Sequence, residues 1–209
     1  MKKALTLGLL ALGFIFQQAN AQIGKGEKMI GGSVGFTSSK TEYKNLTAPE
    51  STNNTFTITP QLGFGLGNNW IVGLGVSYVS TKQETTQGSS KAETKTSAVS
   101  PGIFVRKFHQ FGDKFGIYGQ LDAEYAFGEQ KTTQTGNPDS KSEISGYGIS
   151  ASPGLFYKAS RKFVIEATIG RLGYSSLTTK PDGSSIEVKN KQFTFALTND
   201  LSLGFKLIF

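Results

Sequence analysis

Two carboxylic acids, Asp122 and Glu124, lie two residues apart in the segment 115–128, where large apolar residues alternate with small or polar ones. Such alternation is typical of a β-strand, which would direct both carboxyl groups to the same face. Two neighbouring carboxylates can serve acid–base chemistry or form part of an ion path. Strand alternation also places such pairs side by side without any catalysis, so the pair alone is a weak signal of an active site.

The sequence supplies few other residues for catalysis. Its single histidine, His109, falls beside Lys107 and Phe108 in a segment that we predict to be a short, solvent-exposed turn. Cysteine is absent, no His, Asp and Glu residues show the spacing of a metal site, and no glycine-rich phosphate loop precedes a helix. We therefore predict no enzymatic activity and no cofactor, because no general base is placed where a substrate could reach it.

The elements that carry these residues are predicted strands. From Phe193 to Phe209 every second residue is apolar except Asn199, and this segment is far longer than the usual strand of about 5–6 residues. Seven earlier segments alternate in a similar way. The sequence therefore predicts eight strands, approximately at 28–39, 54–66, 70–82, 94–107, 115–128, 142–157, 162–176 and 191–209.

The connections between the predicted strands alternate in length. Three are short and turn-like, at 67–69, 109–114 and 158–161. The others are long and too polar to build a core, at 40–53, 83–93, 129–141 and 177–190. An even strand count with short turns on one side and long loops on the other predicts an all-β fold, an eight-stranded antiparallel up-and-down transmembrane β-barrel.

The less apolar face of the strands separates a membrane barrel from a soluble, lipocalin-like barrel. A face exposed to water normally carries many Lys and Glu residues, but this face carries mainly Gly, Ser, Thr and Ala. Such residues suit the interior of an eight-stranded barrel, which side chains just fill. We therefore predict that the apolar face meets lipid, with aromatic residues near one rim (Trp70, Phe115, Phe163) and the other (Tyr78, Tyr125, Phe127).

In this orientation a small set of charged and amide side chains enters the lumen: Arg106, Gln120, Asp122, Glu124, Glu166, Asp200 and Lys206. Charges of both signs in a narrow lumen should pair, because an isolated buried charge is costly. We interpret the set as a structural network that fills the barrel; the alternative is an ion path or a carboxylate-lined site. Strict alternation would direct Arg171 to lipid, so we place it near the outer interface or just past a bulge.

A short motif recurs in the second, fourth and sixth predicted strands, with Asn in place of Pro in the eighth. Its copies are Thr59-Pro60-Gln61-Leu62, Ser100-Pro101-Gly102-Ile103, Ser152-Pro153-Gly154-Leu155 and Thr198-Asn199-Asp200-Leu201. Proline removes a donor from the strand ladder and usually marks a bulge or an edge. We therefore predict a bulge repeated at matching depth, with each proline ring on the outer face.

The amino-terminal residues have the pattern of a secretory signal peptide. Lys2 and Lys3 precede an apolar stretch at 4–16, and Ala19-Asn20-Ala21 provides a cleavage signal, so we expect residues 1–21 to be removed. The domain is then 22–209, and its formal charge falls from +7 by two lysines to +5. No basic block accompanies a platform of aromatic residues, so nucleic acid is not an expected partner.

These features make the chain resemble the small outer-membrane β-barrel family, of the OmpX and OmpA-transmembrane-domain type, whose members carry an outer membrane protein beta-barrel domain. The resemblance rests on the signal peptide, the strand pattern, the proline motifs, the segment Phe104-Val105-Arg106-Lys107-Phe108 and terminal Phe209. It implies the outer membrane of a Gram-negative-type bacterium, with outer-membrane lipid and lipopolysaccharide as neighbours. It also implies a C-terminal signal that the barrel-insertion machinery reads, formed by Phe205, Leu207 and Phe209.

The resemblance does not determine an activity, since one fold serves many functions. We predict a monomeric structural scaffold whose polar loops interact with a surface ligand or mediate adhesion, because the polar bulk of the chain lies in those loops. The alternative is a narrow pore or a carrier for a small or hydrophobic solute. A general diffusion pore is disfavoured, because an aqueous channel needs about 16–18 strands.

Overall fold

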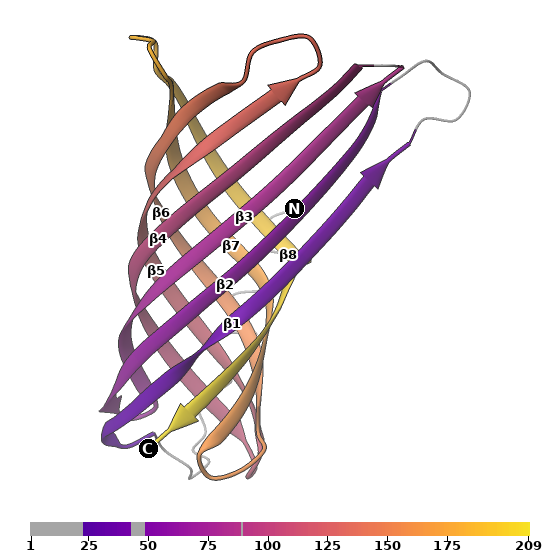
Figure 1. The fold of residues 1–209 in the computed structure, drawn as a ribbon. Helices are drawn as coiled ribbons and strands as arrows, with labels where there is room; N and C mark the ends of the chain where they lie inside the picture. The colour runs from indigo at the N-terminus through magenta and orange to yellow at the C-terminus, as the bar shows by residue number, and fades with distance from the viewer. Residues whose placement is uncertain (1–22, 43–48, 89) are drawn as a thin grey trace, which may run out of the picture.

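The protein folds as a closed barrel of eight antiparallel strands (Figure 1). The computed structural model describes residues 23–42, 49–88 and 90–209, with the backbone alone at 197–201. The predicted signal peptide, 1–21, lies outside the described residues. Each strand pairs with the next and β8 returns to β1, which confirms the predicted up-and-down topology. The strands are β1 (Lys25–Thr41), β2 (Glu50–Gly67), β3 (Trp70–Gln87), β4 (Ser90–Phe111), β5 (Phe115–Gln134), β6 (Ser140–Lys158), β7 (Phe163–Pro181) and β8 (Val188–Ile208).

Short turns join the strands at one end of the barrel, which we call the short-turn end. Between β2 and β3 only Asn68 and Asn69 make the turn, with φ angles of 51° and 65°. Two positive φ angles are typical of the hairpin turn whose twist matches that of the flanking strands, and asparagine tolerates them better than most residues. Ile23, the first described residue, is held at the same end, because its amide donates to Asn69 Oδ1 at 2.8 Å.

At the opposite end, which we call the hairpin end, the strands run well past the predicted loop boundaries. The segment 83–93 is almost entirely strand, because β3 continues to Gln87 and β4 begins at Ser90. Likewise β5 continues to Gln134 and β6 begins at Ser140, within the predicted loop 129–141. The prediction of four long loops was therefore wrong in extent. The polar segments form paired hairpins instead.

Threonine explains why these polar segments pair as strands. Its β-branched side chain favours extended backbone and packs well on a pleated surface. Thr94 and Thr132 face each other across β4 and β5 with hydroxyl oxygens 3.2 Å apart, and Thr55 and Thr81 do the same across β2 and β3 at 3.1 Å. Polar residues occupy both faces of these strand ends, so no apolar alternation marks them in the sequence.

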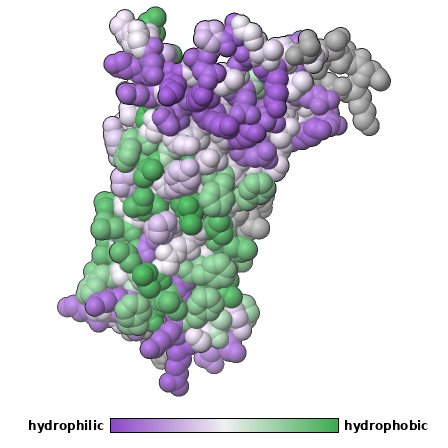
Figure 2. Space-filling view, viewed as in Figure 1, coloured by the Kyte–Doolittle hydropathy of each residue, from purple (hydrophilic) through white to green (hydrophobic). Residues whose placement is uncertain are grey.

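The two faces of the barrel wall differ as predicted. On the face seen in Figure 2, an apolar band covers the part of the barrel near the short-turn end, and a polar surface lies beyond it toward the hairpin end. Outward side chains in the band are strongly exposed, as at Leu74 (61%) and Ile103 (60%). Among the described residues, no helix has the length and apolar character needed to cross a membrane.

The proline motifs lie in β2, β4 and β6 with their rings exposed, but they do not mark a repeated bulge. The register runs through Pro60 against β1 and through Pro101 against β3 without a shift. Shifts occur at two copies of the motif. Beside Pro153, three steps from Ala151 to Gly154 oppose four on β7, and at the β8 copy five steps from Leu197 to Ser202 oppose two on β7. The prediction of a repeated bulge was wrong, because an outward proline on a regular strand loses one ladder hydrogen bond without needing an inserted residue.

Candidate functional site in the barrel lumen

The lumen near the short-turn end is filled by apolar side chains. Phe108 contacts Phe156 edge to face, with ring centroids 5.2 Å apart, and lies 6.0 Å from the ring of Tyr118. The remaining members of this apolar layer are also buried: Ile23, Met29, Ile71, Phe104 and Val164. Glycine makes room for the rings, since a Cβ at Gly116 would lie 2.4 Å from Phe156 Cζ. The layer closes this end of the lumen.

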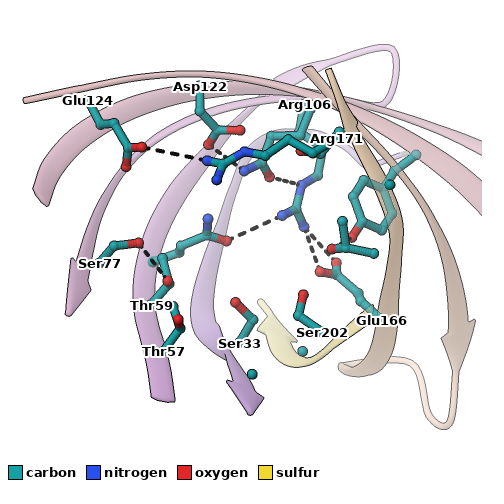
Figure 3. A pocket seen from close by; sticks show the side chains of 18 of the residues that line it. Ser33, Thr57, Thr59, Ser77, Arg106, Asp122, Glu124, Glu166, Arg171 and Ser202 are labelled. Atoms are coloured by element: carbon teal, nitrogen blue, oxygen red, sulfur yellow. Dashed lines mark hydrogen bonds and ion pairs between the residues drawn. The ribbon is translucent and has the colours of Figure 1, made fainter. Parts of the chain in front are cut away.

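Arg106 lies directly beyond the apolar layer and is 3% exposed (Figure 3). Its Nη1 donates to both carboxylate oxygens of Glu166, at 2.7 and 2.9 Å, and its Nε donates to Gln120 Oε1 at 2.6 Å. The guanidinium carbon also lies 4.6 Å from the centroid of the Tyr118 ring. A buried guanidinium with this many partners is held in one position, because each partner restricts a different N–H group.

Gln61 connects Arg106 to a second buried cation. Its Oε1 accepts from Lys206 Nζ at 2.8 Å and from Arg106 Nη2 at 3.3 Å, while Lys206 Nζ lies 3.8 Å from Glu166. The side chains of these ions are 1–3% exposed. Sequence reasoning missed Gln61, although its place between the outward Pro60 and Leu62 puts it on the lumen side. Two cations and one carboxylate give this layer a formal charge of +1.

The predicted carboxylate pair lies farther toward the hairpin end. Asp122 Oδ1 accepts from Gln120 Nε2 at 2.6 Å, and Glu124 Oε1 lies 3.6 Å from Arg171 Nη2 (Figure 3). Two carboxylates and one cation give a formal charge of −1 here, which balances the +1 of the Arg106 layer. Each carboxyl group thus has a polar partner, Gln120 for Asp122 and Arg171 for Glu124.

Arg171 enters the lumen because the wall is irregular beside it. Between Thr168 and Leu172, β7 has one residue more than β6, and this extra residue reverses the alternation. Leu172 therefore faces outward, and Arg171 lines the same cavity as Glu124. Of the two locations that the sequence left open for Arg171, the one just past a bulge is therefore found. Strict alternation would have directed its side chain to lipid instead.

A polar cavity of about 260 Å³ lies above the Arg106 layer. Its wall carries the charged groups described above and many hydroxyls, with Thr59 Oγ1 and Ser77 Oγ 2.7 Å apart. The serine and threonine hydroxyls come from β1, β2, β3, β6, β7 and β8: Ser33, Thr37, Thr55, Thr57, Thr59, Ser77, Ser152, Thr168 and Ser202. Hydroxyls both donate and accept, so the wall suits a polar ligand or ordered water.

Asp200 lies in β8, but its side chain is outside the described part of the structure, so its place in the lumen stays a prediction. His109 was predicted to lie in a turn, but it lies in β4, with the centroid of its ring 5.0 Å from that of the Phe111 ring. The prediction failed because β4 continues as far as Phe111, so the turn begins later. Among the described residues, no three His, Cys, Asp or Glu side chains are placed to hold a metal ion.

The predicted C-terminal signal lies on the outer face of β8. Phe205, Leu207 and Phe209 are each about half exposed, and the Phe205 ring stacks on Phe163 at 6.1 Å. Phe209 also closes the barrel, because its backbone exchanges two hydrogen bonds with that of Lys28, at 2.7 and 3.0 Å.

The sequence model of the outer membrane protein beta-barrel domain family matches residues 7–200. The chain belongs to this family. As a member of it, the protein resides in the outer membrane of a Gram-negative-type bacterium, and its apolar band meets outer-membrane lipid. In such barrels the short turns face the periplasm. The short-turn end is therefore periplasmic and the hairpin end extracellular.

Three small outer-membrane proteins are among the solved structures similar to this outer-membrane barrel. OprG from Pseudomonas aeruginosa is 14% identical, with 89% of this chain and 97% of that chain covered and a TM-score of 0.48. Neisserial surface protein A is 15% identical, with coverage of 91% and 100% and a TM-score of 0.47. Ail of Yersinia pestis, solved with the heparin analogue sucrose octasulfate, is 16% identical, with coverage of 88% and 96% and a TM-score of 0.38. A comparison with the sequences of curated proteins gave no match.

Proposed function

We propose that this outer-membrane protein is a non-catalytic scaffold that presents paired polar hairpins outside the cell for surface interaction or adhesion. The observation that carries the proposal is the continuation of the strands beyond the apolar band. On β3 and β4 the pairing reaches Gln87 and Ser90, next to the hairpin tip. Long flexible loops would lose conformational entropy on binding a partner, whereas a paired wall has already lost it on folding.

Ion pairs on the outer face of the β3–β4 hairpin support a rigid surface. Lys82 Nζ lies 2.8 Å from Glu84 and 3.1 Å from Glu93, and Glu93 also pairs with Lys95 at 2.8 Å. Glu84 adds a contact to Lys91 at 3.3 Å. A single exposed ion pair contributes little, but several joined in a network restrain one another. The network stiffens the hairpin at its exposed end.

The lumen supports the non-catalytic part of the proposal. Asp122 is bound to Gln120 and Glu124 faces Arg171. His109 alternates with the inward Phe108 and therefore lies on the outside of the wall. A catalytic pair would need a nucleophile or base free to meet substrate.

Shortening the hairpins tests the proposal. Residues 83–94 are replaced by Asn-Gly, so that Lys82 still faces Lys95, and 131–141 are replaced likewise, so that Gln130 still faces Ser142. We expect cells that display this variant to lose adhesion to one another and to matrix-coated surfaces, while the heat-dependent gel shift of the folded barrel persists. Unchanged adhesion with an intact barrel would contradict the scaffold function.

The outer face of β8 bears on the partners that we propose. We propose that the protein is a monomer and that Lys189 and Lys191, on the outer face of β8 next to the apolar band, contact phosphate groups of lipopolysaccharide. Neither lysine forms an ion pair among the described residues. Changing both to Gln should reduce the lipopolysaccharide that copurifies with the barrel, and Lys131→Gln, which removes a paired lysine, should not.

The apolar layer bears on the alternative function. A pore would need a continuous path, but Phe108 and Phe156 meet across the periplasmic end of the lumen. A carrier needs only a site that opens on one side. Of the two alternatives, the geometry therefore favours a carrier for a small or hydrophobic solute over a narrow pore.

A further inference from the structure

The seam between β1 and β8 is paired only at its periplasmic end. Six residue pairs join the two strands, from Met29 with Ile208 to Val34 with Leu203, whereas β5 and β6 are paired from Phe115 to Thr132. Among the described residues, Gly35–Thr41 of β1 and 188–202 of β8 make no pair with each other. Figure 1 shows the outer halves of the two strands diverging from the paired region.

The unpaired part of the seam begins inside the apolar band. Outward side chains along the two strand edges are Phe36 on β1 and Phe193 and Phe195 on β8, and they are 66–71% exposed. Among the described side chains of the strands, no other large apolar one is as exposed, because these three lie at strand edges that no neighbouring strand covers. Strand edges in hydrocarbon leave N–H and C=O groups without partners, which costs several kcal/mol for each group. A polar partner at the seam would remove that cost.

The polar cavity lies directly behind this gap. Ser33, Gly35 and Thr37 of β1 and Ser202 of β8 line the cavity and flank the point where pairing ends. The space beside Gly35 is open, because a Cβ placed there would meet only Ser202 Cβ at 3.9 Å and Thr57 Cβ at 4.0 Å. No paired strand therefore separates the cavity from the lipid that meets the gap.

We propose that the gap between β1 and β8 is a lateral portal, through which the polar head of a single-chain amphiphile in the outer leaflet enters the cavity. The chain of the amphiphile stays outside, against Phe36, Phe193 and Phe195. The cavity of about 260 Å³ is smaller than the ~300 Å³ at which pockets for whole drug-sized ligands begin, so it takes the head alone.

The charges of the cavity select the kind of head group. Its described cations are Arg106, Arg171 and Lys206, and its described carboxylates are Asp122, Glu124 and Glu166, so the formal charges cancel. An uncompensated charge in a confined site is costly. A neutral or zwitterionic head group avoids this cost, because it adds no net charge to the cavity. Hydroxyls of the wall and the unpaired backbone groups of the seam supply its hydrogen bonds.

Photocrosslinking tests the portal. The protein is reconstituted in phosphatidylcholine vesicles with lysophosphatidylcholine that carries a diazirine in its head group, and the modified residues are mapped by mass spectrometry. We expect saturable modification of cavity residues beside the gap, such as Thr57 and Ser202. A diazirine at the end of the acyl chain should instead modify Phe36 and Phe193.

Two matched glycine variants complete the test. Gly35→Leu fills the floor of the gap and should reduce head-group crosslinks in the cavity several-fold. Gly119→Leu adds the same side chain on the outer face, where a Cβ meets nothing within 4 Å, and should leave them unchanged. The heat-dependent gel shift verifies that both variants fold. Head-group crosslinks spread around the outer rim of the barrel and absent from the cavity would overturn the portal.

Discussion

The guanidinium of Arg106 on β4 contacts both carboxylate oxygens of Glu166 on β7, across the lumen rather than along the wall. Two strands that are not neighbours in the barrel are therefore joined through its interior. Lys206 completes the layer from β8, at 3.8 Å from the same carboxylate. Glu166 is the only carboxylate between the two cations among the described side chains, so the cost of losing it differs from the cost of losing either cation.

Glu166→Gln should destabilise the barrel more than Arg106→Met. The first variant leaves two buried cations without a carboxylate, whereas the second leaves Glu166 paired with Lys206. Breaking a buried ion pair by removing one partner costs about 3–5 kcal/mol, and we expect Glu166→Gln to fall in that range. Urea unfolding in lipid vesicles, followed by the gel shift, measures both. Equal losses of stability in the two variants would show that Lys206 does not compensate the charge of Glu166 when Arg106 is removed.

The purified protein should give no discrete conductance in planar bilayers at any applied voltage. The rings of Phe108 and Phe156 meet 5.2 Å apart across the periplasmic end of the lumen, and Arg106 lies above them. Replacing both rings by Ala and Arg106 by Ser should open a path and produce measurable steps of current. Steps from the unchanged protein would restore the narrow pore as a function.

A pair of cysteine variants tests the bulge in β7. Arg171→Cys should react with a membrane-impermeant thiol reagent added outside the cell, because residue 171 lines the lumen. Leu172→Cys should not react, because Leu172 faces outward into lipid and is 43% exposed. Strict alternation from Glu166 would predict the reverse result, so the two variants control each other. The chain has no cysteine that could contribute background.

The sequence predicted the wall of the barrel better than its ends and its irregularities. Alternation between Trp70 and Tyr78 specifies a strand and its outer face, because one face meets lipid and the other does not. That physical contrast ends with the apolar band. Beyond it Thr85 and Lys91 both meet water, so neither face stands out and the sequence pattern no longer distinguishes a paired strand from a loop.

The candidate site was predictable only in part, for a related reason. Arg106, Glu166 and Lys206 are recognisable because a charge on a lumen face needs a partner. Their pairing is not, because it depends on which strands face one another across the barrel. The bulge beside Pro153 and the short seam between β1 and β8 depend on register, which arises from the contacts of whole strands and has no signature at single positions such as Gly35.

Acid should loosen the β3–β4 hairpin through Glu93. Two hydrogen bonds lower the pKa of Glu93 from 4.5 to about 2. The one from Lys95 has the larger effect and the one from Lys82 the smaller. The stabilisation from this carboxylate is thus fully present above pH 4.5 and is lost as the pH falls from about 4.5 to about 2. Amide hydrogen exchange of the hairpin should rise in that interval. Glu93→Gln should exchange faster already at pH 7, and salt at about 1 M should weaken the pH effect by screening exposed pairs.

Cysteines at Gly35 and Ser202 should form a disulfide at the first unpaired position of the seam. A Cβ on Gly35 would lie 3.9 Å from Ser202 Cβ, close to the mean of about 3.8 Å in disulfides. The oxidised double variant should run differently from the reduced one on a denaturing gel after boiling, because a long loop is closed. Cysteines at Ser77 and Ser202 are the control, since β3 is three strands from β8 around the wall and strands are about 4.8 Å apart. Rapid closure of the 35–202 pair in the membrane, with the control unchanged, would show that β1 and β8 stay close where their pairing ends. If the 35–202 pair stayed reduced, the strands would separate already at Val34 and Leu203, and the portal would begin one position nearer the periplasm.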